Sequence, residues 1–207
     1  VLCKRKQTLP RRGVPVPGNS IDTDVIIPAR YLKLVTFDRM GEFPFYDERF
    51  NSDGTQKEHP FNEPRYQGAN ILFVNKDFGI GSSREHAPQA LMRWGIKAIV
   101  GESYASIFEG NCLLMGIPAV KTSKESIGSL MEILNTNPET EFTLDLDSKT
   151  ISYSYPQNGG KRVVGIDIPE PYRRALTEGT WDSTRMLYAN MDKVRQTAER
   201  LQQIRGF

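Results

Sequence analysis

The residues best suited to chemistry lie in the stretch DFGIGSSREHAP, where two glycines precede Ser82, Ser83 and Arg84. Backbone N–H groups at a helix start are unsatisfied and carry partial positive charge, and glycines let a ligand approach them closely. Arg84 adds a side chain that can bind a carboxylate or phosphate through two hydrogen bonds, and both serine hydroxyls can donate to the same anion. The stretch therefore predicts an anion site at a strand-to-helix turn.

The same stretch also fits a structural role that needs no ligand. Ser82 is followed three residues later by Glu85, which matches the capping box, in which each of the two residues satisfies a backbone N–H group at the helix start. Capping and anion binding can coexist, so the pattern alone leaves both interpretations open.

A more active role for Ser82 requires a way to activate its hydroxyl, which by itself is a poor base and a poor nucleophile. His86 lies on the same turn, but a helix N-terminus disfavours its protonated form, and a purely structural histidine is the alternative. The other route is a deprotonated serine that backbone N–H groups and a nearby cation stabilise. The order of glycine, serine and arginine suits this second route.

A second polar stretch, Asp22, Thr23 and Asp24, precedes a short apolar run at 25–27 that is expected to be extended. Two acids one residue apart in an extended turn point to opposite sides, so we do not expect Asp22 and Asp24 to act as a carboxylate pair. The structural alternative is a turn in which the carboxylates accept hydrogen bonds from nearby backbone N–H groups.

Length and composition are those of a single soluble globular domain. The chain has 207 residues and a net charge of +2, and no basic face that would bind nucleic acid is evident. No apolar run approaches the roughly 18 residues of a membrane helix, and the start lacks the apolar core of a signal peptide. Several basic residues within positions 1–12 are expected to form a solvated tail.

The two cysteines, Cys3 and Cys112, are far apart and lack the spacing of metal ligands or of a disulfide framework. We expect both to be reduced and structurally inert, which fits a cytosol-like compartment. Two thiols cannot supply the three or four thiolates of an iron–sulfur cluster. We therefore expect no metal site in this chain.

Apolar patterns predict an α/β domain with a parallel core, because buried strands and helices alternate between residues 70 and 120. The expected strands are 13–17, 70–75, 97–100 and 117–120, and the expected helices between them are 85–94 and 103–116. Ser103 and Ser123 are expected to cap the helices that follow them. After Pro138 we expect antiparallel strands at 141–146, 151–155 and 162–168, then helices at 169–177 and 185–207.

Residues 36–68 show no period and are rich in charges, glycines and prolines. Loops of this length are uncommon in compact domains and often serve as lids or binding loops. The alternative is a disordered insertion, but the segment also contains seven aromatic side chains that need something to pack against. We therefore expect a long loop that is packed or ordered by a partner.

Two motifs together resemble a known family. GSSREHA at 81–87 and DTDVIIPARYL at 22–32 closely resemble the small subunits of 3-isopropylmalate dehydratase, which correspond to the swivelling last domain of the aconitases. The similarity extends over most of 13–120, and GTWDST at 179–184 is also similar to the bacterial two-subunit enzymes. The resemblance implies an aconitase-like swivelling β/β/α fold for the whole chain, 1–207, as a single domain.

The resemblance also implies an activity. Such an enzyme is a hydro-lyase that isomerises 2-isopropylmalate and 3-isopropylmalate by dehydration and rehydration in leucine biosynthesis. It is active only with its large subunit, which carries a [4Fe–4S] cluster that binds the substrate hydroxyl. The alternatives are a related hydro-lyase that acts on homocitrate, citraconate or 2-methylcitrate, and a carboxylate-binding module without catalytic activity. A cytoplasmic location is expected, or the plastid stroma if a leader is missing.

The roles of the site residues follow from the same resemblance. Ser82 is similar in position to the catalytic base, used as an alkoxide, and Ser83, Arg84 and Asp24 are similar to substrate-binding residues. The residues expected to support them are Thr23, Gly79, Gly81, Glu85 and His86. The apolar residues that follow Tyr31 could contact an isopropyl group, although ordinary packing explains them better.

Overall fold

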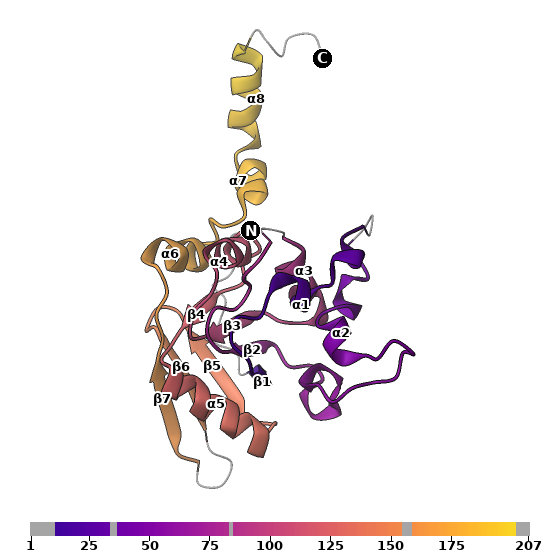
Figure 1. The fold of residues 1–207 in the computed structure, drawn as a ribbon. Helices are drawn as coiled ribbons and strands as arrows, with labels where there is room; N and C mark the ends of the chain where they lie inside the picture. Colours follow the sequence, from indigo (N-terminus) through magenta and orange to yellow (C-terminus); the bar gives the residue numbers. More distant parts are fainter. Residues whose placement is uncertain (1–10, 34–36, 83–84, 155–158, 202–207) are drawn as a thin grey trace.

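The computed structural model describes residues 11–33, 37–82, 85–154 and 159–201. These residues form a seven-stranded mixed sheet with the strand order β4-β3-β2-β1-β5-β6-β7 (Figure 1). The parallel part consists of β1 (Arg11–Val16), β2 (Ile71–Val74), β3 (Ala98–Gly101) and β4 (Ala119–Lys121). The antiparallel part consists of β5 (Glu141–Asp145), β6 (Thr150–Ser154) and β7 (Lys161–Gly165).

The parallel part forms because its strands are continuous apolar runs that can be buried on both faces. Every residue of β2 and β3 is buried, and Leu72 is aligned with Ile99 in the register of this pair. Two of the three parallel connections pass through one longer helix, α3 (His86–Trp94) between β2 and β3 and α4 (Ser106–Leu114) between β3 and β4, whereas β1 and β2 are joined by a long segment with short helical turns. The alternation predicted for residues 70–120 is therefore confirmed.

The remaining long helices follow β4 and β7. They are α5 (Lys124–Thr136), α6 (Glu170–Glu178), α7 (Ser183–Ala189) and α8 (Met191–Arg200). The hydroxyl of Ser123 accepts a hydrogen bond from the N–H group of Ser126, 3.2 Å away, so the predicted cap of α5 is confirmed. The apolar face of α5 is buried against β1 and β2.

Three predictions about local structure are wrong. The residues expected to be extended at 25–27 belong mostly to a short helix, α1 (Thr23–Ile26). Ala105, not Ser103, is the N-cap of α4, because the Ser103 hydroxyl is used by a neighbouring loop. Glu85 is the N-cap of α3 without a side-chain hydrogen bond, so the capping box of Ser82 and Glu85 does not form.

The basic start of the chain is also not simply a solvated tail, although residues 1–10 lie outside the described residues. Arg12 belongs to β1, forms an ion pair with Glu139 at 2.8 Å and donates a hydrogen bond to the carbonyl oxygen of Gln67 at 2.6 Å. Arg12 thus ties the sheet to the end of the long segment that precedes β2.

That segment, of which residues 37–68 are described, contains short helical turns. They are the α-helix α2 (Tyr46–Arg49) and the 3-10 helices η2 (Met40–Glu42), η3 (Pro60–Asn62) and η4 (Pro64–Tyr66). Phe45, Phe61 and Tyr66 are buried, each with no more than 1% of its surface exposed. Gly41 lies so close to α3 that an added Cβ would be 2.7 Å from the backbone of Arg93. The segment is therefore packed onto the domain.

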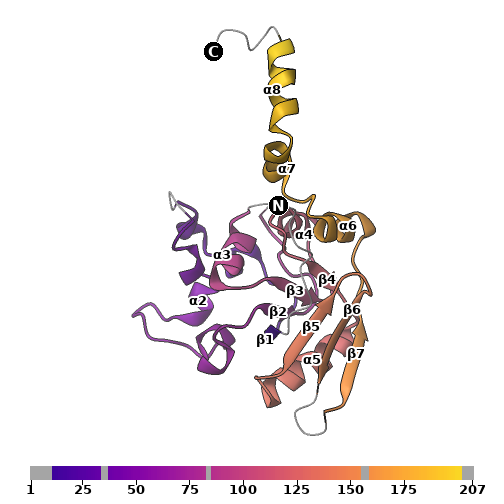
Figure 2. The ribbon, with the colours of Figure 1, turned by 180° about the vertical axis from the view of Figure 1, so that it is seen from behind.

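The chain ends in an arm that leaves the body of the domain. Helices α7 and α8 extend away from the sheet in both views (Figures 1 and 2), where the sequence pattern predicted one helix at 185–207. No residue of α8 is buried. None of the helices in the described parts of the chain is long and apolar enough to cross a membrane.

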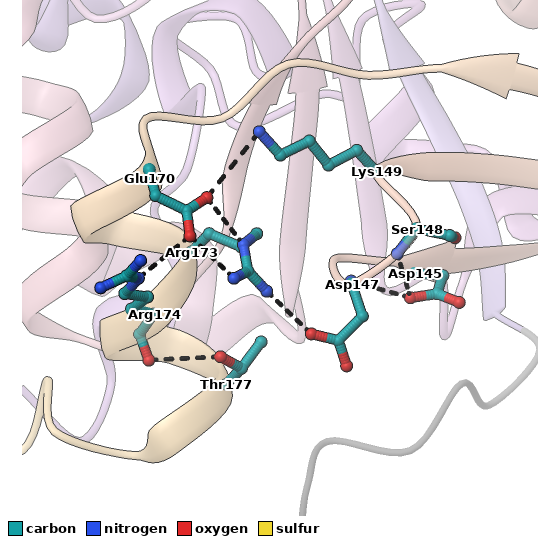
Figure 3. A network of polar contacts seen from close by, with 8 residues as sticks. All are labelled: Asp145, Asp147, Ser148, Lys149, Glu170, Arg173, Arg174 and Thr177. Carbon is teal, nitrogen blue, oxygen red and sulfur yellow. Dashed lines mark hydrogen bonds and ion pairs between the residues drawn. The ribbon is translucent and has the colours of Figure 1, made fainter.

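Helix α6, in contrast, is fastened to the turn between β5 and β6 by a cluster of ion pairs (Figure 3). The carboxylate of Glu170 contacts Arg173 at 2.8 Å, Arg174 at 3.0 Å and Lys149 at 3.9 Å. Arg173 also contacts Asp147 at 2.8 Å. The hydrogen bonds from Arg173 and Arg174 lower the pKa of Glu170 to about 2.

Candidate active site

Two loops that are distant in sequence lie side by side at the carboxyl ends of β1 and β2. The N–H group of Gly79 donates to the carbonyl oxygen of Ile21, and the N–H group of Thr23 donates to that of Ile80, both at 2.8 Å. These bonds continue the parallel pairing of β1 and β2 beyond the strands. Open α/β domains bind ligands at the carboxyl edge of the parallel sheet, so these two loops are the expected position of a ligand site.

The loop after β3 joins the other two. The N–H group of Phe78 donates to the carbonyl oxygen of Ser103 at 3.1 Å, and the N–H group of Ala105 donates to that of Phe78 at 3.0 Å. The Ser103 hydroxyl accepts a hydrogen bond from the Asp77 N–H group at 2.8 Å and donates one to the Asp77 carboxylate at 2.9 Å. The loops after β1 and β3 therefore hold the stretch 77–82, which belongs to the loop after β2, in place.

The two glycines of this stretch are required by their surroundings. Gly79 has φ +79°, and an added Cβ would lie 2.3 Å from the ring of Phe108. Gly81 has φ +98°, and an added Cβ would lie 2.4 Å from the carboxylate of Asp22. Both the left-handed backbone and the close contacts exclude larger residues.

Ser82 follows directly and is held through its backbone. Its N–H group donates to the Thr23 hydroxyl at 3.0 Å, and Thr23 is buried with 4% exposure. This N–H group is therefore not free to bind an anion, although the sequence predicted that the N–H groups of this turn would be unsatisfied. Ser83 and Arg84, the predicted carboxylate-binding pair, lie outside the described residues.

The two acids of the second polar stretch, Asp22 and Asp24, lie at the start of α1. Asp22 caps α1, because its carboxylate accepts a hydrogen bond from the N–H group of Asp24 at 2.7 Å. Asp24 itself is exposed on the first turn of α1, next to the loop that carries Ser82. The structure thus brings Thr23, Asp24, Gly79, Gly81 and Ser82 together.

Glu85 and His86 lie on the other side of the turn, at the start of α3. The Glu85 carboxylate is exposed and accepts a hydrogen bond from the Gln89 side chain at 2.6 Å. The His86 ring packs against Phe37 with 5.5 Å between ring centroids. Its buried Nδ1 atom has no hydrogen-bond partner among the described residues. Among the described residues, neither side chain forms a hydrogen bond with Ser82.

Among the described residues, no group of three His, Cys, Asp or Glu side chains converges in a way that could hold a metal ion. Cys112 is fully buried, and burial raises the pKa of its thiol far above the usual range, which leaves it a poor ligand. Cys3 lies outside the described part of the chain.

Two supporting residues were missed by sequence reasoning. Asp22 was interpreted only as a turn residue, although its position two residues before Asp24 does signal a cap. Phe108, whose ring lies against Gly79, gave no signal, because it is far from the turn in sequence and typical of any helix core.

Comparisons with known proteins place this site in a family. The sequence model of the aconitase C-terminal domain matches residues 10–125. The small subunit of 3-isopropylmalate dehydratase from Thermus thermophilus is 48% identical over 171 residues, which cover 83% of this chain and 82% of the relative. The small subunit from Synechocystis is 43% identical over 190 residues, which cover 92% and 90% of the two chains.

A solved structure supports the fold. The structure of a 3-isopropylmalate dehydratase from Methanocaldococcus jannaschii aligns with a TM-score of 0.63 at 22% identity, over 92% of this chain and 98% of that one. The chain belongs to the aconitase C-terminal domain family, in the group formed by the small subunits of 3-isopropylmalate dehydratase. The family and the fold class predicted from the sequence are thereby confirmed.

Proposed function

We propose that this chain is the small subunit of a hydro-lyase that isomerises 2-isopropylmalate and 3-isopropylmalate in leucine biosynthesis. The observation that carries the proposal is the turn at 79–82, which the loops after β1 and β3 fix at the carboxyl edge of the sheet, beside Asp24. It occurs in a chain that is 48% identical to a small subunit of 3-isopropylmalate dehydratase. The whole chain acts as one swivelling domain that brings this turn to a partner.

Ser82 is the base in this proposal. Its hydroxyl oxygen, as the alkoxide, takes the proton from the carbon next to a substrate carboxylate, hydroxide leaves the neighbouring carbon, and an alkene forms. Return of the proton and of hydroxide to exchanged carbons, which together add one water across the double bond, completes the isomerisation. Ser83 and Arg84 bind the carboxylate, whose negative charge grows as the proton leaves. Asp24, exposed at the same edge, contributes a further polar contact to the substrate.

The partner that we propose is the large subunit. It would carry a [4Fe–4S] cluster, which when bound supplies a Lewis acid for the hydroxyl that leaves. This assignment fits the described part of the chain, where the Cys112 thiol is buried and its raised pKa makes it a poor ligand for a cluster. We also propose a cytoplasmic location, where such thiols stay reduced.

Exposed apolar residues beside the turn fit the approach of this partner. Val25, 37% exposed, follows Asp24 directly. Ile107, 53% exposed, is the neighbour of Phe108, whose ring lies against Gly79. Because the large subunit must reach Ser82 to complete the reaction, its surface would cover these two residues and remove their apolar area from water.

The proposal is tested by reconstitution. This chain and its large subunit are expressed together without oxygen, and conversion of 2-isopropylmalate is followed through the ultraviolet absorbance of the alkene intermediate. We expect turnover only when both chains are present. A complex that forms with a loaded cluster but does not convert isopropylmalate would contradict the proposed substrate. Turnover by this chain alone would contradict the need for a partner.

A further inference from the structure

The contact between the α1 loop and the serine turn has a consequence for catalysis. We propose that Asp22 and Thr23 are positioning residues, which clamp the backbone of Gly81 and Ser82 and so set the position of the Ser82 hydroxyl. This inference rests on the proposed function, in which Ser82 is the base. Neither residue needs to touch the substrate.

Thr23 forms the first half of the clamp. Its hydroxyl accepts the hydrogen bond from the Ser82 N–H group at 3.0 Å and lies 3.4 Å from the Asp22 carboxylate, toward which it can donate. Thr23 is itself fixed, because it is buried and its own N–H group donates to the carbonyl oxygen of Ile80 at 2.8 Å. A β-branched side chain also has few rotamers, so the hydroxyl has little freedom to leave Ser82.

Asp22 forms the second half. Its carboxylate occupies the space beside the Gly81 Cα, where an added Cβ would lie 2.4 Å from one oxygen and 2.6 Å from the other. The carboxylate cannot move away easily, because it also accepts the hydrogen bond from the Asp24 N–H group at 2.7 Å. The cap of α1 and the position of the turn are therefore set by the same side chain.

The clamp matters because a base must lie within hydrogen-bond distance of the proton that it takes. A displacement of about 1 Å is enough to reduce a rate by about 100-fold. The Ser82 N–H group donates to a side chain rather than to a carbonyl oxygen of a preceding helical turn, since α3 begins only at His86. Loss of the Thr23 hydroxyl would remove the hydrogen bond that holds the Ser82 N–H group. The backbone that carries the base would then be less firmly positioned.

The test compares two substitutions of Thr23 in the complex with the large subunit. Thr23→Val removes the hydroxyl but keeps the shape of the side chain, whereas Thr23→Ser keeps the hydroxyl. We expect Thr23→Val to lower kcat by about 10- to 100-fold with KM changed less than about threefold, and Thr23→Ser to restore most of kcat. A variant that merely destabilised the fold would lower the amount of active complex instead, which titration of active sites would reveal.

A second measurement does not depend on activity. Hydrogen exchange of the Ser82 amide is followed by NMR in the full small chain, where we expect Thr23→Val to accelerate exchange by about tenfold and Thr23→Ser to leave it unchanged. Unchanged exchange or unchanged kcat in Thr23→Val would overturn the clamp. Absence of turnover in the unaltered complex would overturn the proposed function instead, and the exchange rates would still decide whether the hydrogen bond holds the turn.

Asp22 has its own pair of variants. Asp22→Asn keeps an oxygen that can accept the Asp24 N–H hydrogen bond and keeps the volume beside Gly81, so we expect kcat to stay within about threefold. Asp22→Ala loses both contacts, and we expect a loss similar to that of Thr23→Val. Equal activity of Asp22→Ala and the unaltered complex would remove Asp22 from the proposal.

Discussion

The two halves of the sheet are built differently, and the difference fits the position of the candidate site in the parallel half. In the parallel half, β2 and β3 are buried along their whole length, and the loops that leave their carboxyl ends are joined by backbone hydrogen bonds. In the antiparallel half, the edge strand β7 is exposed at four of its five residues. That half is joined to α6 by the ion pairs of Figure 3.

This comparison shows what each kind of contact is suited to. Buried strands are rigid, and backbone hydrogen bonds fix loops to within a fraction of an ångström, which a catalytic turn requires. Exposed ion pairs are screened by solvent and contribute little, and α6 is also held by its buried residue Leu176 and by contact with α4. Substitutions in the parallel half should therefore change activity, and those in the antiparallel half should not.

Apart from removal of the base itself, the largest effect is expected at the contact between Gly81 and Asp22. Gly81→Ala should lower kcat of the complex by about 100-fold, because the new Cβ would lie 2.4 Å from the Asp22 carboxylate and displace the turn. The matched control is Gly54→Ala, since Gly54 has φ +83° but nothing within 4 Å of an added Cβ. The control should cost about 1 kcal/mol of stability through backbone strain alone. Equal kcat values for the two variants would refute the fixed turn.

The next effect concerns the apolar surface beside the turn. Ile107→Asp should weaken binding of the large subunit by about tenfold or more, because a charge would be buried in the proposed interface. Val163→Asp on β7 is the control, as Val163 is 60% exposed and Ile107 is 53% exposed. Affinities measured by titration of one chain with the other should differ only for Ile107→Asp. Equal loss in both variants would place the interface elsewhere.

A pH effect is expected in the packed segment before β2. Burial, with a smaller effect of the Arg49 charge, lowers the pKa of His59 to about 4, and the His59 Nδ1 atom accepts a hydrogen bond from the Phe61 N–H group at 3.1 Å. The unfolded chain binds this proton with a pKa near 6.5, so it holds more protons than the folded chain between about pH 4 and 6.5. Stability should therefore fall as the pH falls through this range, by at most about 3 kcal/mol in all and by less because solvent partly screens the half-buried ring.

The measurement is urea unfolding at pH 7 and pH 4.5 for the unaltered chain and for His59→Gln. The variant should lose less stability over this range, since carboxylates contribute equally to both proteins. An identical pH dependence of the two would show that His59 does not titrate on unfolding.

The smallest effect is expected in the antiparallel half. Glu170→Gln should lower the thermal midpoint slightly at neutral pH, because it removes the charge that pairs with Arg173 and Arg174. The low pKa of Glu170 means that its contribution is present above about pH 4.5 and is lost as the pH falls toward 2. Turnover of the complex should not change. A loss of kcat would show that the two halves are coupled.

The parallel core could be predicted from the sequence because its signals are local. The runs at 70–75 and 97–100 are apolar and short, and they are separated by a periodic helix. The helical turns within residues 37–68 could not be predicted, since tertiary packing of Phe45, Phe61 and Tyr66 stabilises them rather than any period in the sequence. The break between α7 and α8 could not be predicted either, because no glycine or proline marks it.

For the candidate site, the motifs predicted which residues to consider but not how they are held. Thr23, Asp24, Gly79, Gly81 and Ser82 do come together. The contacts that fix them join segments far apart in the chain, as between Asp22 and Gly81, and no pattern in either segment specifies the other. Their assigned roles remain predictions.

The central claim is that the parallel half supplies the base, and Ser82→Ala in the reconstituted complex tests it most directly. Ser154→Ala, at the end of β6 in the antiparallel half, is the control. We predict that Ser82→Ala lowers kcat for 2-isopropylmalate by about 1,000-fold while substrate still binds to the complex, and that Ser154→Ala leaves kcat unchanged. Turnover by Ser82→Ala at the rate of the unaltered complex would contradict the account.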